Sequence, residues 1–361
     1  MIASPDSRFW TGKRVFLTGH TGFKGGWLAL WLERLGATVK GYALAPEPGP
    51  NLFALARVAA TTESVIGDIR DRATLASELS AFAPDIVFHL AAQPLVRRSY
   101  AEPVTTVETN VIGTVNLLEA VRSCPRVAAV VVVTSDKCYL NREWHWGYRE
   151  GESLGGHDPY SASKACAELV TQSWRLSFLG EGGQDGRRCA LATGRAGNVI
   201  GGGDWAADRL VPDILRDLTA GVPVTVRNPD AIRPWQHVLE PLAGYLVLAE
   251  RLTGEGGLSQ AEAWNFGPSD DDARPVQWIV DRLVEAWPDG GSSTHDRSAQ
   301  PHEAHYLKLD CSRARTLLGW RPRWSLAEAL DEIVRWQSAW LADEDMHRVS
   351  LETIDRYGES A

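Results

Sequence analysis

Apolar and polar residues follow two different periodicities in the first two-thirds of the chain. Short apolar runs rich in β-branched residues predict strands at residues 14–18, 38–44, 64–67, 85–90 and 127–133. Longer segments of helical periodicity separate them and predict helices at residues 22–35, 73–82 and 104–121. Strands that alternate with helices are typical of a parallel, doubly wound α/β sheet, which binds its ligand at the carboxyl ends of the strands.

The pattern changes after about residue 195. Glycine and proline become more frequent and the apolar runs become shorter, while helical periodicity returns at residues 276–287 and 326–341. We therefore predict two domains. Residues 1–194 form the doubly wound sheet, and residues 195–361 form a smaller C-terminal α/β domain, with some of the chain crossing back to the sheet around residues 230–265.

Composition and charge narrow the range of functions. The 361 residues are 44% hydrophobic and 23% charged, which is ordinary for a globular protein and excludes wholesale disorder. Acidic residues outnumber Lys and Arg by 46 to 37, and the net charge of −9 disfavours binding to nucleic acid. No apolar stretch approaches the ~20 residues that cross a membrane. The five cysteines have no C-x-x-C spacing, which favours reduced thiols and a cytoplasmic location.

Three glycines directly after the first predicted strand indicate a ligand. Gly19, Gly22 and Gly25 form a G-x-x-G-x-x-G pattern, a spacing variant of the dinucleotide fingerprint G-x-G-x-x-G. Glycine lets a pyrophosphate approach the backbone, and the helix N-terminus offers it free N–H groups. A glycine-rich turn without a ligand would give the same pattern. A P-loop is excluded, because no G-K-[ST] sequence follows.

Two further segments favour a dinucleotide. Asp68 follows the third predicted strand, where its carboxylate can accept a hydrogen bond from an adenine amino group. Small residues follow the fourth strand at 89–93, where a cofactor would lie against the backbone. The second strand ends at 41–45 without an acid for the ribose hydroxyls and without an Arg for a 2′-phosphate, so this position leaves NAD and NADP open.

Two groups of residues are candidates for oxidation and acid–base chemistry. Tyr160 and Lys164 lie one helical turn apart on one helix face. The ammonium would lower the phenol pKa from about 10, which would make Tyr160 a general base for an alcohol. Ser135, Asp136 and Lys137 follow the fifth predicted strand and would face the same cleft. An exposed helix pair and a turn with solvated charges are the respective alternatives.

The chain resembles the nucleotide-sugar branch of the extended short-chain dehydrogenase/reductases, and within it the CDP-glucose 4,6-dehydratases. The resemblance rests on motifs at residues 19–25 (GHTGFKG), 134–139 (TSDKCY), 195–205 (RAGNVIGGGDW), 233–241 (RPWQHVLEP) and 264–268 (WNFGP). It implies a doubly wound Rossmann sheet that binds NAD in residues 1–194. It also implies a nucleotide-sugar-binding domain in residues 195–361.

The reaction implied by this resemblance converts CDP-D-glucose into CDP-4-dehydro-6-deoxy-D-glucose and water, with NAD regenerated in each turnover. It would serve deoxysugar biosynthesis, such as that of lipopolysaccharide O-antigen. Tyr160 would take the C4 hydroxyl proton beside Ser135, and Asp136 would protonate the departing C6 hydroxyl. Lys137 is the candidate base at C5, where the related dTDP-glucose enzymes carry Glu.

Three alternatives remain open within this resemblance. They are a 4,6-dehydratase for another nucleotide sugar, a nucleotide-sugar 4-epimerase, and a non-catalytic dinucleotide sensor. Asp136 and Lys137 count against an epimerase, because epimerisation at C4 needs no such acid–base pair. Tyr160 and Lys164 together count against a sensor.

The resemblance also implies binding residues and a partner. The cofactor would contact Gly19, Thr21, Gly22, Phe23, Lys24, Gly25, Asp68, Ile69, Leu90, Ala91, Ala92, Gln93, Thr109, Tyr160 and Lys164. The nucleotide sugar would contact Asn198, Arg209 and Arg233, since arginine forks match phosphate oxygens. A second copy of the chain would pack against the helices at 104–121 and 159–178, in a dimer or tetramer.

Two other motifs are rejected as sites. The G-x-S-x-G sequence at 151–155 lacks the buried strand that must precede a nucleophile elbow. His302 and His305 lack the H-E-x-x-H spacing of zinc proteases, so we expect no metal.

Overall fold

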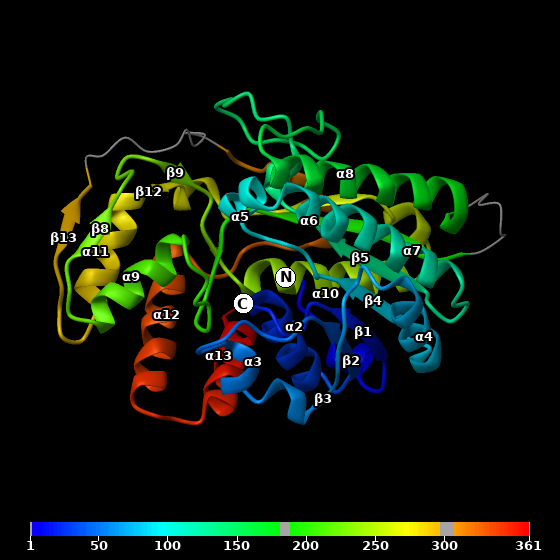
Figure 1. The fold of residues 1–361 in the computed structure, drawn as a ribbon, viewed down its shortest axis with the longest axis horizontal. Helices are drawn as coiled ribbons and strands as arrows, with labels where there is room; N and C mark the ends of the chain where they lie inside the picture. Colours follow the sequence, from blue (N-terminus) through cyan, green and yellow to red (C-terminus); the bar gives the residue numbers. More distant parts are fainter. Residues whose placement is uncertain (1, 181–187, 297–306, 361) are drawn as a thin grey trace.

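A sheet of parallel strands forms the centre of the molecule (Figure 1). The computed structural model describes residues 2–180, 188–296 and 307–360. The strand order is β11-β6-β5-β4-β1-β2-β3, so the predicted parallel, doubly wound sheet is confirmed. Chain order reverses between β1 and β4, and ligands of such sheets bind in the crevice at this reversal. The strands are β1 (Arg14–Thr18), β2 (Thr38–Ala43), β3 (Thr62–Ile66), β4 (Ile86–His89), β5 (Ala129–Val133), β6 (Ala190–Ala196) and β11 (Ala263–Phe266).

Helices cover both faces of this sheet (Figure 1). The helices α2 (Phe23–Arg34) and α10 (Leu239–Thr253) share a core with one face, whose side chains include Val15 and Val131. The helices α4 (Arg72–Phe82) and α7 (Gly113–Arg122) share a core with the other face, which includes Phe16 and Val130. Successive side chains of a strand point to opposite faces. The apolar runs of β1 and β5 are therefore continuous because both of their faces are buried.

The helix predicted at residues 104–121 is divided in the structure. A short α6 (Pro103–Val107) leads into a π-helical turn at Glu108–Ile112, and α7 follows. The helix α8 (Pro159–Trp174) packs beside α7 and starts at Asp158, whose carboxylate accepts a hydrogen bond from the Ser161 N–H. This cap places Tyr160 in the first turn of α8. The helix α8 packs against the turn that follows the carboxyl end of β5.

A second group of elements, on the left of Figure 1, surrounds its own apolar core. It contains α9 (Leu210–Thr219), α11 (Val276–Ala286) and α12 (Leu326–Leu341), while α13 (Met346–Glu359) packs back on α2. The chain returns to the main sheet as α10 and β11, and β6 runs through residues 194 and 195. The division into two domains at this point stays a prediction.

Short elements complete the described fold. They are α1 (Ser7–Trp10), α3 (Leu52–Leu55), α5 (Val96–Ala101), β7 (Val199–Ile200), β8 (Val224–Val226), β9 (Ile232–Arg233), β10 (Gln236–His237), β12 (Arg274–Pro275) and β13 (Ser293–His295). No helix within the described ranges is long and apolar enough to cross a membrane. His302 and His305 lie outside the described residues.

Candidate active site

The glycine loop after β1 has a backbone that only glycine can adopt. Gly19 has a φ of +83°, and a Cβ atom there would lie 2.7 Å from the amide nitrogen of Ala91. A Cβ atom on Gly25 would lie 2.0 Å from the carbonyl oxygen of Gly19. The helix α2 starts after Gly22 without a side-chain cap, so its first N–H groups face the loop unblocked. This cradle fits the pyrophosphate of a dinucleotide.

The three other predicted cofactor residues of this motif contact different parts of the molecule. The Thr21 hydroxyl donates a hydrogen bond to the carbonyl oxygen of Leu44, which ties the loop to the end of β2. Phe23 packs against Gly201. The Lys24 ammonium lies 5.9 Å from the ring centroid of Tyr245. Burial lowers the pKa of Lys24 to about 7, and nearby cations add to the decrease.

The end of β3 places Asp68 in an ion pair. Its carboxylate accepts hydrogen bonds from the backbone N–H of Arg70 at 2.9 Å and from the guanidinium of the same residue at 2.6 Å. These contacts hold the pKa of Asp68 below its ordinary value. Ile69 packs on Gly113, and a Cβ atom added to Gly113 would lie 2.5 Å from the Ile69 side chain. The adenine contact of Asp68 stays a prediction, and it would have to compete with Arg70.

The end of β4 is held by a buried polar cluster. The Thr18 hydroxyl accepts hydrogen bonds from the N–H groups of Leu90 and Ala91, both at 3.2 Å, and pairs with His89 at 2.7 Å. Burial lowers the pKa of His89 to about 3, so this histidine is neutral at pH 7. Ala92 continues the small-residue stretch, so the backbone here stays accessible to a flat ligand.

Asn110 is a buried residue of the site that the sequence analysis missed. Its amide oxygen accepts a hydrogen bond from the Gln93 N–H at 2.8 Å, and its amide NH₂ donates to the Ser163 hydroxyl at 2.9 Å. It thereby joins the loop after β4 to α8, beside Lys164. The predicted Thr109 is its neighbour in the π-helical turn. In the sequence, the feature that could have indicated Asn110 is a polar residue at an apolar position of a helical pattern.

Tyr160 and Lys164 are both buried on α8. Burial lowers the pKa of Lys164 to about 8, and its ammonium donates a hydrogen bond to the carbonyl oxygen of Val133 at 3.4 Å. Burial raises the pKa of Tyr160 to about 12, although a hydrogen bond with Ser135 acts in the opposite direction. The structure thus differs from the expected lowered phenol pKa. Desolvation outweighs the Ser135 hydrogen bond and the charge of Arg209, and the charges of Asp136 and Asp158 raise the pKa further.

Ser135, Asp136 and Lys137 form a tight turn directly after β5. The Ser135 hydroxyl donates a hydrogen bond to the Asp136 carboxylate at 3.0 Å and accepts one from the Lys137 N–H at 3.2 Å. Asp136 is 3% exposed, and burial raises the pKa of its carboxyl group above the ordinary value. The charges of Lys137 and Arg233 act in the opposite direction. A buried carboxyl group with a raised pKa is suited to proton donation.

A buried ion pair adjoins this turn, and the sequence analysis did not predict it. Glu168 and Arg195 pair at 2.8 Å, and each side chain is 4% exposed. Glu168 also accepts hydrogen bonds from the hydroxyls of Thr134 and Thr193. Arg195 donates to the Tyr139 hydroxyl at 2.7 Å. The network therefore holds both ends of the segment that carries Ser135, Asp136 and Lys137. In the sequence, the feature that could have indicated this ion pair is Arg195, a charged residue inside an apolar strand.

The predicted substrate residues lie around the same cleft. The Asn198 carbonyl oxygen accepts a hydrogen bond from the Gln236 N–H at 3.0 Å. Arg209 pairs with Asp204 at 2.8 Å, and its charge acts on both Tyr160 and Lys24. Arg233 is close enough to Asp136 to lower the pKa of that carboxyl. Both arginines are thus near the catalytic residues, while the contacts of all three residues with a substrate stay predictions.

These residues define an enzyme that oxidises an alcohol with a bound dinucleotide and then performs acid–base chemistry on the product. Lys24 follows the dinucleotide cradle at the start of α2. The charges of Lys164, Arg209 and Asp136 all act on Lys24, so these residues lie close to the cradle.

The chain belongs to the GDP-mannose 4,6-dehydratase family, whose sequence profile matches residues 16–333. A CDP-glucose 4,6-dehydratase of Salmonella typhimurium is 57% identical over 352 residues, which are 98% of each chain. A dTDP-glucose 4,6-dehydratase of Streptomyces antibioticus is 32% identical over 279 residues, which are 75% of each chain. The predicted membership among the nucleotide-sugar dehydratases is therefore confirmed.

Solved structures share the fold. A dTDP-glucose 4,6-dehydratase of Streptomyces venezuelae, solved with NAD bound, superimposes with a TM-score of 0.75. The match covers 92% of this chain and 99% of that chain, with 24% sequence identity. It agrees with the doubly wound sheet and its additional C-terminal elements.

Proposed function

We propose that the protein is a CDP-glucose 4,6-dehydratase with NAD as its resident cofactor. The observation that carries this proposal is the placement of the buried Asp136 carboxyl group beside Tyr160, next to the glycine cradle. A simple dehydrogenase needs the phenol and the cradle, whereas the loss of water also needs an acid. The 57% identity with a CDP-glucose enzyme over nearly the full chain supports CDP-glucose as the substrate.

The first half of the reaction uses Tyr160 and Lys164. Tyr160 removes the proton of the C4 hydroxyl, and Ser135 holds that hydroxyl in place. Lys164 lies one turn away and stabilises the phenolate when the substrate closes the cleft. NAD held in the glycine cradle would supply the hydride acceptor for C4 and the hydride donor for C6, so no external reductant would be required.

The second half uses the turn after β5. The C4 ketone acidifies the proton at C5. Lys137 is the candidate base that removes this proton and returns it to C5 when hydride reaches C6. Asp136 donates its proton to the C6 hydroxyl, which leaves as water. Its raised pKa keeps the carboxyl group protonated to a higher pH than an exposed Asp, which is what this step requires.

A turnover assay with a panel of substrates tests this function. The purified protein is incubated separately with CDP-, dTDP-, UDP- and GDP-glucose, and the products are identified by mass spectrometry. We expect CDP-glucose to lose one water and to give a 4-keto-6-deoxy sugar, with much slower conversion of the others. An isomer of unchanged mass would indicate an epimerase, and exclusive turnover of another nucleotide sugar would contradict the assigned substrate.

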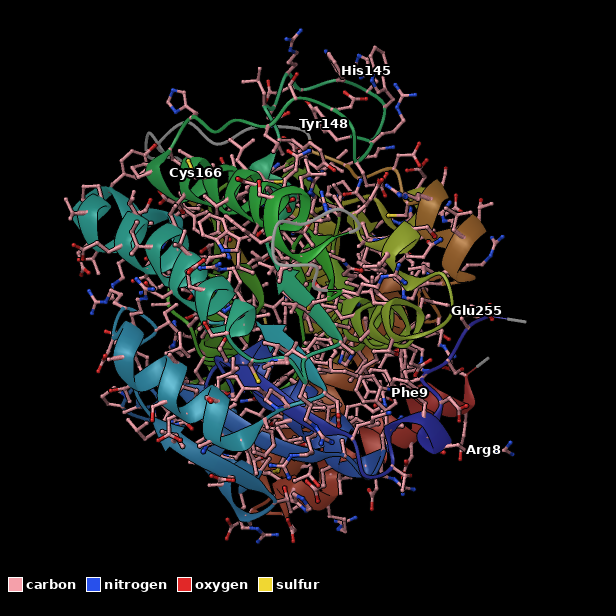
Figure 2. The ribbon with its side chains drawn as sticks, turned by 90° about the vertical axis from the view of Figure 1, so that its right-hand side faces the viewer. Arg8, Phe9, His145, Tyr148, Cys166 and Glu255 are labelled. Carbon is pink, nitrogen blue, oxygen red and sulfur yellow. The ribbon has the colours of Figure 1, made fainter. Side chains whose placement is uncertain are left out.

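We also propose a homo-oligomer, either a dimer or a tetramer. Apolar side chains are exposed on α5, α6, α8 and the π-helical turns Glu108–Ile112 and Arg175–Leu179, which follow α6 and α8. They are Tyr100, Val104, Val107, Ile112, Leu169 and Leu176. Figure 2 shows Cys166 on the outer side of α8, so this face looks away from the sheet. Light scattering at micromolar concentration should give at least twice the mass of one chain. The free cysteines fit the proposed cytoplasmic location.

A further inference from the structure

A hydroxyl group without a partner lies beside the catalytic residues. Tyr245 is on α10, and its side chain is fully buried. Among the described residues, its hydroxyl has no hydrogen-bond partner. Buried hydroxyl groups in folded proteins are nearly always paired, so an unpaired one indicates that something else completes its contacts.

The position of this hydroxyl is set by packing. A Cβ atom on Gly194 of β6 would lie 2.6 Å from the Tyr245 ring, so the strand leaves room for the ring only because this residue is glycine. On another side, the ring of Phe266 meets the Tyr245 ring edge-on, with centroids 5.4 Å apart. The ring is thus held between β6 and β11, and the hydroxyl has a fixed direction.

The neighbours of Tyr245 come from both the dinucleotide cradle and the proposed catalytic residues. Lys24, in the first turn of α2, lies over its ring. Asp136 and Tyr160 are close enough that their charges, together with burial, raise the pKa of the Tyr245 hydroxyl above its ordinary value. The hydroxyl therefore stays protonated and can donate a hydrogen bond. It lies between the pyrophosphate cradle and the residues that handle the sugar.

A dinucleotide bound in the cradle would extend toward Tyr160, and so toward Tyr245. Its diphosphate would rest on the glycine loop, and hydride transfer needs its ring within about 3–3.5 Å of the sugar carbon that Tyr160 serves. Tyr160 approaches from α8, which packs beside α7, and Tyr245 approaches from α10, which packs on β5 and β6 from the opposite face to α7. A nicotinamide ring held between the two tyrosines would have Tyr245 on the side away from α8.

We propose that Tyr245 binds the nicotinamide end of the cofactor, with its hydroxyl donating a hydrogen bond to the carboxamide oxygen. This inference rests on the proposed function, because it requires a nicotinamide dinucleotide in the cradle. The contact fits chemically, since a neutral donor meets a neutral amide and no charge is left unpaired. It would fix the rotation of the ring, and therefore the face that exchanges hydride.

Binding measurements on Tyr245→Phe test the proposal without turnover. Calorimetry on protein freed of dinucleotide gives the dissociation constants of NAD⁺ and of ADP-ribose, which lacks only the nicotinamide. We expect the NAD⁺ dissociation constant to rise about 2- to 10-fold, as for loss of one neutral hydrogen bond, and the ADP-ribose constant to stay unchanged. An NAD analogue without the carboxamide should bind the variant and the unaltered protein equally.

Tyr357→Phe is the matched control. Its ring is also buried, but its hydroxyl donates to Glu240 at 2.6 Å, so the change should lower the thermal midpoint without altering NAD⁺ binding. Equal weakening of NAD⁺ and ADP-ribose in Tyr245→Phe would overturn the proposal, as would unchanged NAD⁺ binding with a raised KM for CDP-glucose. If the unaltered protein bound no dinucleotide at all, the proposed function itself would fail.

Discussion

The two sides of the cleft are held in place by different means. On the dinucleotide side the shape is fixed by backbone geometry, as the close contact of Gly25 with Gly19 shows. On the substrate side it is fixed by pairs of charged side chains. Arg97 of α5 meets Asp208 at 2.9 Å across 111 residues of chain, and Arg209 meets Asp204 at 2.8 Å.

This difference predicts different sensitivities. A glycine whose added Cβ atom would lie 2–3 Å from other backbone atoms has no room for a side chain, but this packing carries no net charge and is insensitive to salt. Ion pairs that are partly exposed tolerate changes in volume, and they weaken as ionic strength rises. We therefore expect the dinucleotide side to fail on small steric changes, and the substrate side to respond mainly to charge.

Gly25→Val should have the largest effect. A Cβ atom at this position would lie 2.0 Å from a carbonyl oxygen, so α2 must move away from the loop or the chain must fail to fold. We expect NAD⁺ binding to be lost and the thermal midpoint to fall by at least several degrees. Gly151→Val is the control, because it lies outside the cradle and a Cβ atom there would meet no other atom within 4 Å. If both variants bound NAD⁺ with similar affinity, the shape of the dinucleotide side would not depend on the close backbone packing of its glycines.

Asp136→Asn should separate the two halves of the reaction. An amide cannot protonate the C6 hydroxyl, and the loss of a general acid typically slows a step about 10²–10⁴-fold. Tyr160 is unchanged, so the oxidation at C4 should still proceed. Rapid mixing with CDP-glucose should show reduced nicotinamide, by its absorbance, that decays slowly.

Two further variants complete this test. Tyr160→Phe should show no such build-up, because its block comes earlier. Turnover of Asp136→Asn at the normal rate would rule out Asp136 as the acid. Lys137→Ala with unchanged exchange of the C5 proton for deuterium would rule out Lys137 as the base.

Buried histidines should make the whole fold sensitive to mild acid. Burial lowers the pKa of His20 to about 4 and the pKa values of His89 and His237 to about 3, against 6.5 in the unfolded chain. Below pH 6.5 the unfolded chain therefore binds protons that the folded chain does not. Each histidine should remove about 1.4 kcal/mol of unfolding free energy per pH unit as the pH falls, or roughly 4 kcal/mol together.

Urea unfolding at pH 7, 6 and 5 measures this slope. Most carboxyl groups titrate below this window, but Glu240 acts in the opposite direction. Burial raises the pKa of Glu240 to about 7, so the folded protein binds a proton there that the unfolded chain does not, which offsets the effect of about one histidine. His20→Asn should reduce the slope by about 1.4 kcal/mol per pH unit. Stability that is constant between pH 7 and 5 would show that these histidines are not neutral in the folded protein.

The two sides also differ in how far the sequence predicts them. The strands and the glycine cradle follow from short-range patterns, and β1 was predicted with its observed bounds, Arg14–Thr18. Asn110, Glu168 and Tyr245 could not be assigned in this way. Their roles depend on contacts between segments far apart in the chain, such as α10 with β6, and no local pattern encodes which of them meet.

Arg209→Gln should give the smallest change, and one confined to the substrate side. Arg209 lies close enough for its charge to act on Tyr160 and is 31% exposed, so its attraction for a diphosphate is partly screened. We expect KM for CDP-glucose to rise about 3- to 10-fold and to depend less steeply on salt, with NAD⁺ affinity unchanged. Arg216→Gln, two turns along α9 and paired with Asp213, is the matched control and should leave KM as it is. If both variants raised KM equally, the total charge of α9, and not Arg209 in particular, would attract the substrate. The substrate side would then not depend on individual charged residues, as the comparison with the dinucleotide side requires.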